Sequence, residues 1–513
     1  MMTLPMIFQD GMMLQRDKPA AVWGTAQPGS LVCARIQGRT AEAAVDADGN
    51  WLLYLPPLSA SESEELRIAE QADAQAASEI VIRDVAVGEV WIGGGQSNME
   101  YALRYEKHRG DPAIVHPVEN LRFYDVPEIA FDGQYESFDY SRVGRWRRAQ
   151  SEEDLDFFCA SGYFFQKEIR ADLNVPVGIV GCNWGGTRSA AWISPESVQR
   201  VGGPWLAEYQ AWEEKLDMEQ YWQAQRENPE NDTGNPHAEG CELIMPQTIT
   251  MDMIRAIDPA VADALEAPQE PRLLPKDVPS ALYEHMVKTI APFTARGVLW
   301  YQGESDDVPG RQGLYRDMLT ALISDWRALW REPRLPFLIV QLPGWEKWIN
   351  LVNYDYMTIR QCQQEAADTV PGTYLCSISD SGEQLDIHPK DKKVVGERLA
   401  LLARCHVYGE EVPCDPPRAS GAVREQDDVI RISFEHTYGA MGIEGGAIAA
   451  LQVYDGETQI SFEAGTDGEA LVIRLLQPRT AGALRVSLAK ERWYRVNLYN
   501  AAGLPAIPFE LEI

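Results

Sequence analysis

The chain has 513 residues, of which 45% are hydrophobic, and a formal net charge of −31 at pH 7. This length predicts about three domains with ample core. The acidic balance excludes nucleic acid as a natural partner, because phosphates have to be neutralised by Lys and Arg. No apolar run approaches the roughly 20 residues of a membrane span, so we expect no membrane insertion.

The N-terminal segment has no basic flank followed by a long apolar stretch and a small-residue cleavage site. We therefore expect a cytoplasmic protein. The eight cysteines lie between Cys33 and Cys414 without a C-x-x-C pair or a dense framework. Isolated buried thiols are the expected interpretation, so neither structural disulfides, nor a metal, nor a cofactor is predicted.

Residues 1–84 contain short segments of alternating apolar and polar residues, broken by Gly, Pro and Asp-Gly turns. This pattern is typical of a small β-sandwich. Residues 409–513 return to the same alternation and predict a C-terminal β-domain.

Residues 85–202 and 279–408 alternate apolar strands with amphipathic helices, which predicts an α/β domain with three layers (α/β/α) and a mainly parallel sheet. The expected strands are 85–92, 121–124, 177–180, 298–301, 337–342 and 374–378. The expected helices include 157–173, 314–330 and 390–404.

Residues 203–278 interrupt this domain with acidic, aromatic sequence that predicts a helix over 205–226 and then a Pro-rich link. We interpret them as an insertion over the active site. Its tryptophans, Trp205, Trp212 and Trp222, could stack on sugar rings, but packing of the insertion onto the body is the favoured explanation.

Ser97 lies in the turn Gly94-Gly95-Gln96-Ser97-Asn98-Met99, directly after the expected strand 85–92. Glycines before a serine allow a sharp turn and a close approach of a substrate carbonyl to main-chain N–H groups, as an oxyanion hole requires. Met99 stands where the G-x-S-x-G pattern of α/β-hydrolases requires Gly, so the turn does not indicate an α/β-hydrolase. For a lone turn, a serine that only caps the next helix is the commoner case.

Asp386 and His388 favour a catalytic serine over a capping one. Side chains at i and i+2 of an extended segment point the same way, about 7 Å apart at Cα. Pro389 keeps His388 extended before the following helix. For an isolated D-x-H, a capping Asp and a surface His would be favoured, but together with Ser97 the pair predicts a Ser-His-Asp triad.

Two further glycine turns follow expected strands, at Trp184-Gly185-Gly186-Thr187-Arg188 and at Trp300-Tyr301-Gln302-Gly303-Glu304-Ser305-Asp306. Parallel α/β sheets gather ligand groups at the carboxyl ends of their strands. We therefore expect these two turns, the turn of Ser97 and the segment of Asp386 and His388 to converge on one cleft.

These motifs together resemble the sialate O-acetylesterase family of SGNH hydrolases, whose members include acetyl xylan esterases. The resemblance rests on 95–100 (GQSNME), 184–187 (WGGT), 300–305 (WYQGES) and 386–389 (DIHP). It extends through 10–19, 23–24 and 498–505, and so covers most of the chain except roughly 203–278.

The resemblance implies that Ser97 is the nucleophile, His388 the general base and then acid, and Asp386 the orienting carboxylate. It also implies an oxyanion hole, whose expected donors are the N–H of Ser97, the N–H of Gly186 or its neighbour Gly185, and the side chain of Gln302.

Two acidic residues of the turn at 300–306, Glu304 and Asp306, need separate roles. Family members often have Asn where this chain has Asp306, and a carboxylate there would repel an oxyanion, so we expect Asp306 to face another group. Glu304 is the rival for the triad acid, or else braces the turns. Asp386 ranks above it because the sequence itself brings Asp386 to His388.

The implied function is a carbohydrate O-acetylesterase that acts on an O-acetylated sugar or oligosaccharide through an acyl-serine intermediate. Arg188 could bind the carboxylate of a sialic acid, although an ion pair with one of the surplus acids is an equal alternative. An acetyl xylan or oligosaccharide esterase, a catalytically silent carbohydrate-binding protein, and a lipid or aryl esterase stay open as alternatives.

Overall fold

The structure is a computed structural model that describes residues 2–72, 75–134, 144–227, 248–267, 271–477 and 483–513. Its contacts divide the chain into two compact units. The first unit comprises Met1–Ile244, Pro271–Ser305 and Asp317–Phe337, and the second comprises Met245–Glu270, Asp306–Arg316 and Leu338–Ile513.

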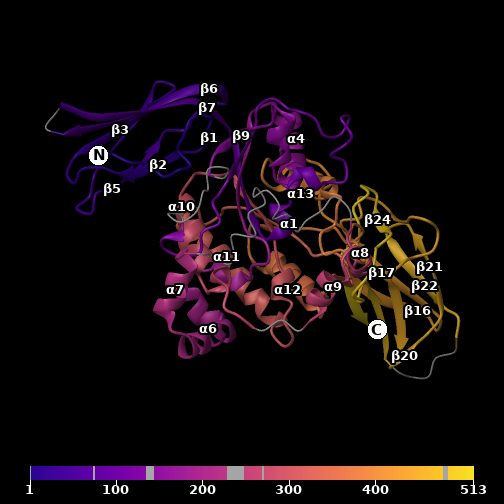
Figure 1. Cartoon of the computed structure of the whole chain (residues 1–513). Helices are drawn as coiled ribbons and strands as arrows, with labels where there is room; N and C mark the ends of the chain where they lie inside the picture. The colour runs from indigo at the N-terminus through magenta and orange to yellow at the C-terminus, as the bar shows by residue number, and fades with distance from the viewer. Residues whose placement is uncertain (1, 73–74, 135–143, 228–247, 268–270, 478–482) are drawn as a thin grey trace. The chain divides into compact units, whose positions relative to one another are not determined.

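The first unit begins with β-structure. Its strands are β1 (Met13–Gln15), β2 (Ala20–Thr25), β3 (Leu31–Ile36), β4 (Arg39–Ala44), β5 (Asn50–Leu55), β6 (Ser61–Ala72) and β7 (Gln75–Gly95). β6 and β7 lie side by side as a long antiparallel pair (Figure 1). β7 pairs with β1 and β6 as far as Gly88 and then, from Glu89 onward, with strands of a parallel sheet. One strand therefore links the N-terminal β-structure to the sheet that carries the turn of Ser97.

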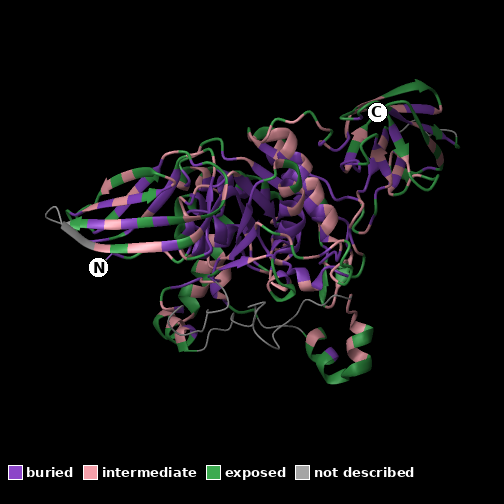
Figure 2. Ribbon diagram, turned by 90° about the horizontal axis from the view of Figure 1, so that it is seen from above, coloured by how far each residue is buried: buried purple, intermediate pink, exposed green. Residues whose placement is uncertain are grey.

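The parallel sheet of the first unit has the order β11-β7-β10-β8-β9. Its further strands are β8 (Leu121–Asp125), β9 (Trp146–Arg148), β10 (Val177–Asn183) and β11 (Gly297–Tyr301). β7, β10, β11 and β8 pair in parallel, and only β9 is antiparallel. Every residue of β10 and β11 is buried (Figure 2), as expected where both faces of a parallel sheet are covered. The α/β class with a mainly parallel sheet and additional β-sheets is confirmed.

Helices and helical turns follow these strands. They are α1 (Ser97–Glu100), η1 (Leu103–Tyr105), α3 (Glu152–Asp156), α4 (Ala160–Leu173), η2 (Ser189–Trp192), α5 (Pro195–Val201), α6 (Gly203–Lys215), α7 (Met218–Glu227), η4 (Pro275–Asp277), η5 (Tyr283–Val287), α10 (Lys288–Ile290), η6 (Glu304–Asp306), η7 (Gln312–Leu314) and α11 (Tyr315–Leu329). The expected helical segment 205–226 is divided into two helices, because the backbone is extended at Leu216 between α6 and α7. Trp205 is buried and the Trp222 ring lies 5.4 Å from that of Phe131, so both tryptophans pack against protein.

The second unit contains the remaining α/β elements and the C-terminal strands. The α/β elements are α8 (Met251–Ile257), α9 (Pro259–Glu266), β12 (Phe337–Val340), β13 (Lys347–Trp348), β14 (Leu351–Val352), α12 (Tyr356–Thr369), β15 (Thr373–Cys376) and α13 (Lys392–His406). β12 and β15 are neighbours in their sheet. α13 begins two residues later than predicted, because the Asp391 side chain caps it by accepting the N–H of Val394.

The C-terminal part of this unit is built from antiparallel sheets, as the alternating sequence predicted. The strands are β16 (Arg418–Gln426), β17 (Val429–Glu435), β18 (Met441–Ile443), β19 (Leu451–Asp455), β20 (Thr458–Gln459), β21 (Phe462–Asp467), β22 (Ala470–Leu475), β23 (Leu484–Leu488), β24 (Leu498–Asn500) and β25 (Phe509–Glu512). Two four-stranded sheets, β16-β17-β22-β21 and β20-β19-β23-β25, enclose a core of aliphatic side chains such as Ile432, Val453 and Ile473.

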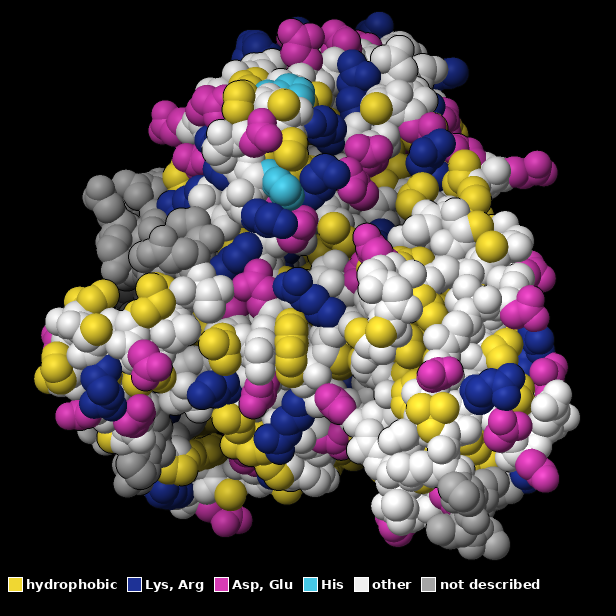
Figure 3. Space-filling view, turned by 90° about the vertical axis from the view of Figure 1, so that its right-hand side faces the viewer, with side chains coloured by type: hydrophobic (Ala, Val, Ile, Leu, Met, Phe, Trp, Pro, Cys, Tyr) yellow, Lys and Arg dark blue, Asp and Glu magenta, His cyan; other side chains and the backbone are white. Residues whose placement is uncertain are grey.

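Among the described residues, no helix is both long and apolar enough to cross a membrane. On the face drawn in Figure 3, Lys and Arg side chains are interspersed with Asp and Glu side chains. That face therefore has no continuous basic surface of the kind that binds nucleic acid.

Candidate active site

The turn that carries Ser97 begins where β7 ends. Gly95 has a φ of +141°, and a Cβ atom there would lie 2.1 Å from the carbonyl oxygen of Tyr301, so only glycine fits. The N–H of Gln96 donates to the same oxygen at 3.1 Å. Ser97 is the first residue of α1 and is partly exposed. A strand, a tight turn and a short helix thus present this serine as a nucleophile elbow does.

Two hydrogen bonds tie this turn to the turn after β11. Asn98 Nδ2 donates to Glu304 Oε1 at 2.6 Å, and the N–H of Ser305 donates to Gln96 Oε1 at 3.2 Å. Asn98 and Glu304 are both buried. Within the first unit, the Glu304 side chain therefore connects two strand-end turns.

The turn after β10 lies against Ser97. A Cβ atom built on Gly185 would be 3.2 Å from Ser97 Cβ. The N–H of Gly185 donates to Glu100 Oε2 at 2.6 Å, and Lys276 Nζ donates to the Gly185 carbonyl oxygen at 2.7 Å. Gly186, the next residue, has a φ of +73°. The side chains of Glu100 and Lys276 thus hold the N–H and the carbonyl oxygen of Gly185.

Glu100 is electrostatically unusual. Burial, reinforced by the charge of Asp125, raises the pKa of Glu100 to about 8, against the opposing effects of the Gly185 N–H and of Lys276. Near neutral pH its carboxyl group is therefore largely protonated, and it can still accept the Gly185 N–H.

Gln302 is fully buried, and its Nε2 donates to the carbonyl oxygen of Thr187 at 3.1 Å. The Thr187 hydroxyl in turn donates to the carbonyl oxygen of Trp184 at 2.7 Å. The side chain predicted as an oxyanion donor therefore also fastens the turn after β11 to the turn after β10.

Arg188 is engaged by residues of the predicted insertion. Its Nη1 lies 3.0 Å from Glu208 Oε1, and its guanidinium carbon lies 4.5 Å from the centroid of the Trp205 ring. This is the ion pair that the sequence left as the alternative to a role in binding a substrate carboxylate.

In the second unit, Asp386 and His388 form a buried pair. Asp386 Oδ1 accepts the main-chain N–H of His388 at 2.8 Å and lies 3.5 Å from His388 Nδ1. Lys390 Nζ lies 2.9 Å from the other carboxylate oxygen, and the Trp348 and His388 rings form a T-shaped pair with centroids 4.8 Å apart. The two neighbours fix both the carboxylate and the plane of the ring.

These contacts set the charges of the pair. Burial alone would raise the pKa of Asp386, but the hydrogen bond from His388 and the Lys390 ammonium bring it below its ordinary value. Burial lowers the pKa of His388, and Lys392 and Lys390 add to this effect against the attraction of Asp386. A negative carboxylate beside a neutral imidazole is the state that a general base needs.

The structure therefore brings the predicted site residues together in two groups. Ser97, Gly185, Gln302 and Glu304 belong to the first unit, and Asp386 and His388 to the second. Asp306 is buried in the second unit.

Sequence reasoning assigned no role to Glu100, Asn98, Lys276 or Lys390. Glu100 and Asn98 stand inside the GQSNME motif, which was the available signal, whereas Lys276 lies in the insertion and belongs to no motif.

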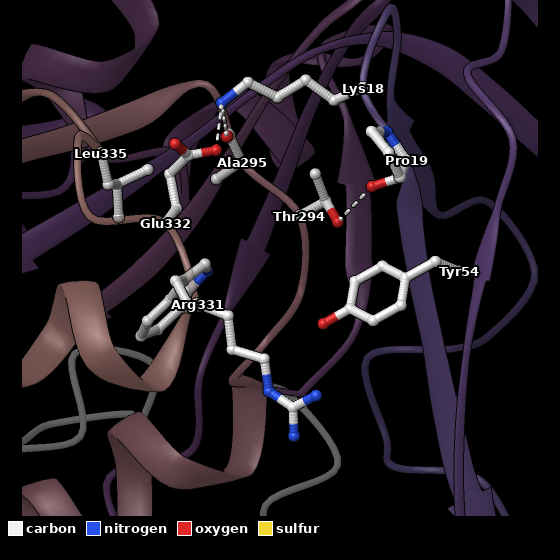
Figure 4. A pocket seen from close by; sticks show the side chains of 9 residues that line it. Lys18, Pro19, Tyr54, Thr294, Ala295, Arg331, Glu332 and Leu335 are labelled. Carbon is white, nitrogen blue, oxygen red and sulfur yellow. Dashed lines mark hydrogen bonds and ion pairs between the residues drawn. The ribbon is translucent and has the colours of Figure 1, made fainter.

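A hollow of about 480 Å³ elsewhere in the first unit has none of the predicted site residues in its lining (Figure 4). Lys18 Nζ points to Glu332 at 3.4 Å and to the Ala295 carbonyl at 3.3 Å, and the Thr294 hydroxyl donates to the Pro19 carbonyl at 3.0 Å. Its lining includes no serine, cysteine or histidine, so the turn of Ser97 is the stronger candidate.

Known proteins similar to this chain are carbohydrate esterases. A family profile described as carbohydrate esterase, sialic acid-specific acetylesterase, matches residues 272–402. The sialate O-acetylesterase of Rattus norvegicus is 25% identical over 434 residues, which cover 78% of this chain and 72% of the relative, and that of Homo sapiens is 24% identical over 435 residues, covering 78% and 70%. A solved carbohydrate acetylesterase from Xanthomonas citri is 28% identical with a TM-score of 0.74, covering 99% of both chains. Residues 272–402 therefore match a sialic acid-specific acetylesterase domain, and most of the chain is similar to sialate O-acetylesterases and to a carbohydrate acetylesterase.

Proposed function

We propose that this protein is a carbohydrate O-acetylesterase that uses Ser97 as its nucleophile, with His388 as general base and Asp386 as the carboxylate that orients it. The assignment follows the SGNH hydrolases that the motifs resemble. The hydrogen-bonded turn of Ser97 and the buried Asp386–His388 pair each have the local geometry that this role requires.

The observation that carries the proposal is the restraint of the Gly185–Gly186 peptide beside Ser97. In a trans peptide, the C=O of one residue and the N–H of the next point in opposite directions. Because Lys276 holds the Gly185 carbonyl, it also fixes the direction of the Gly186 N–H. Glu100 already accepts the Gly185 N–H, so we assign Gly186 rather than Gly185 as an oxyanion donor, together with the N–H of Ser97.

The chemistry follows from these roles. His388 accepts the proton of Ser97 as the serine oxygen attacks the acetyl carbonyl, and the N–H donors stabilise the tetrahedral oxyanion. Collapse of this intermediate breaks the bond to the sugar oxygen, which His388 protonates. Water, activated by the same imidazole, then releases acetate from the serine and completes the cycle.

The Glu304 side chain is assigned a bracing role rather than the triad acid, because it accepts the Asn98 amide. Gln302 stays a candidate third donor, and its bond to the Thr187 carbonyl would orient its amide.

Two classes of sugar compete as substrate. The curated relatives are named sialate O-acetylesterases, which favours O-acetylated sialic acid. The ion pair of Arg188 with Glu208 favours a neutral acetylated oligosaccharide, because a sialate carboxylate would have to displace Glu208 from the arginine.

The test is acetate release from a panel of O-acetylated sialic acids, acetylated xylo-oligosaccharides and an aryl acetate, with Ser97→Ala as the blank. Release from either sugar class above the blank supports the proposal, and the ratio of kcat/KM between the classes selects the substrate. Binding of these sugars without acetate release would establish the catalytically silent alternative, and release from the aryl acetate alone would establish a general esterase.

A further inference from the structure

The end of α13 and the segment before β16 bring two cysteines, a histidine and an aspartate together. Cys405 and His406 are the last residues of α13, and Cys414 and Asp415 follow in the connecting segment. The ligand atoms of Cys405, His406 and Cys414 all lie within 4.8 Å of one another. His406 Nε2 lies 3.4 Å from Cys414 Sγ and 2.8 Å from Asp415 Oδ1. All four residues belong to the second unit.

Neighbouring side chains hold this cluster in place. The Tyr374 ring stacks on the imidazole of His406 with centroids 4.0 Å apart and planes 10° apart. The Tyr438 hydroxyl accepts the main-chain N–H groups of Cys414 and Asp415 at 3.1 and 3.0 Å. Outer contacts of this kind orient ligand side chains in metal sites.

The composition of the cluster selects the ion. Two thiols, an imidazole and a carboxylate are the ligand types of a tetrahedral Zn²⁺ site, whereas Mg²⁺ and Ca²⁺ require oxygen ligands. Zn–S bonds of about 2.3 Å and Zn–N bonds of about 2.1 Å place tetrahedral ligand atoms about 3.5 Å apart. The separation of 3.4 Å between Cys414 Sγ and His406 Nε2 matches this value.

An ion pair between His406 and Asp415 does not explain the positions of Cys405 and Cys414. The contact between His406 and Asp415 would be complete without sulfur, yet the sulfur atoms of both cysteines lie beside the imidazole. The side chains of His406 and Asp415 are 22% and 26% exposed, which leaves an ion a route from solvent.

We propose that Cys405, His406, Cys414 and Asp415 form a structural zinc site that ties the end of α13 to the segment leading into β16. The sequence predicts no metal here because the spacing C-H-x7-C-D lacks a C-x-x-C pair. The fold closes that spacing by turning the chain back after α13. With four protein ligands the site has no open position, so its role is to hold the two segments together.

The experiment measures zinc in the full-length protein without depending on esterase activity. Protein purified without chelators is expected to hold one zinc ion per chain by elemental analysis and by native mass spectrometry. Replacement of zinc by Co²⁺ should produce a thiolate-to-cobalt charge-transfer band and the intense visible bands of a tetrahedral site. Zinc should also raise the unfolding temperature of the metal-free protein.

Three variants give the comparison. Cys414→Ser should weaken zinc binding by more than about 100-fold, and Tyr438→Phe, which keeps all four ligands, by about 10-fold. Cys362→Ser removes a buried thiol of α12 outside the cluster and should leave zinc binding unchanged.

Three results would overturn the site. Zinc retained at one ion per chain in Cys414→Ser would place the ion elsewhere. No binding of added zinc or cobalt by reduced protein would leave an ordinary ion pair with two neighbouring thiols. A disulfide between Cys405 and Cys414 in protein prepared under reducing conditions would make the pair redox-active instead.

Discussion

The Gly185–Gly186 turn and the Asp386–His388 segment are both held rigidly, but by different parts of the chain. Glu100 and Lys276 hold the glycine turn from 85 and 91 residues away in the sequence. Asp386 and Lys390 hold their segment from within four residues. The comparison teaches that the proposed base is oriented by local sequence, whereas the proposed oxyanion donor is oriented by tertiary structure.

The largest effect on the rate is expected for Ser97, the proposed nucleophile, because the proposed base and the proposed oxyanion donor both act on its reaction. Ser97→Ala should lower kcat by about 10⁴- to 10⁶-fold with the fold intact, because only oxyanion and binding effects then remain. The measurement is acetate release, with Ser433→Ala, an exposed serine of β17, as the matched control. Turnover of Ser97→Ala within about tenfold of the wild type would remove the assignment.

The second largest effect on the rate distinguishes the two candidates for the triad acid, Asp386 and Glu304. Asp386→Asn should lower the single-turnover rate by about 10⁴-fold, because the imidazole loses its correct tautomer and the stabilisation of its charged form. Glu304→Gln keeps the shape and the acceptor oxygen that Asn98 uses, so it should cost much less. The opposite ranking would move the triad acid to Glu304 and make the local pair a structural one.

A smaller effect on the rate is expected from loss of the Lys276 side chain, which holds the Gly185 carbonyl from a distant part of the sequence. Lys276→Met should lower kcat by about tenfold and leave KM nearly unchanged, less than the 10²- to 10³-fold loss typical of removing a donor itself. Lys288→Met removes an exposed lysine whose Nζ lies 2.6 Å from Glu284 Oε2, and serves as the control. A change confined to KM or to thermal stability would show that Lys276 does not position the donor.

The smallest effect concerns stability rather than rate. A carboxyl group with a higher pKa in the folded than in the unfolded state binds its proton more tightly when folded. The stabilisation by Glu100 is therefore complete below its ordinary pKa of 4.5 and is lost as the pH rises through about 8. Glu100→Gln should flatten the pH dependence of the free energy of unfolding across this window.

Urea denaturation at several pH values measures this slope, with Glu457→Gln, an exposed glutamate after β19, as the control. A slope that is the same in Glu100→Gln and in the wild type would mean that another group binds the proton.

The same contrast explains what could be predicted from the sequence. The strands around 85–92, 177–180 and 298–301 are apolar runs bounded by glycine turns, so their existence and parallel pairing were accessible. The Asp386–His388 contact was accessible as well, because an i, i+2 spacing needs no knowledge of the fold.

The remaining site features depend on tertiary contacts that no spacing encodes. Lys276 reaches the Gly185 carbonyl from a short 3₁₀ turn at the end of the predicted insertion, and Glu208 reaches Arg188 from α6 of the same insertion. The break at Leu216 was also missed, because the apolar and aromatic pattern continues across it.

The most direct test asks whether His388 activates Ser97. An aryl phosphonate that mimics the tetrahedral intermediate should form one adduct per chain on Ser97, identified by peptide mass spectrometry. The rate of labelling should fall on acidification with a midpoint below about 6.5, since burial lowers the pKa of His388. In His388→Asn this titration should disappear and the rate should drop by about 10³-fold or more. Labelling of Ser97 in His388→Asn at the wild-type rate, or an adduct on another residue that abolishes acetate release, would contradict the account.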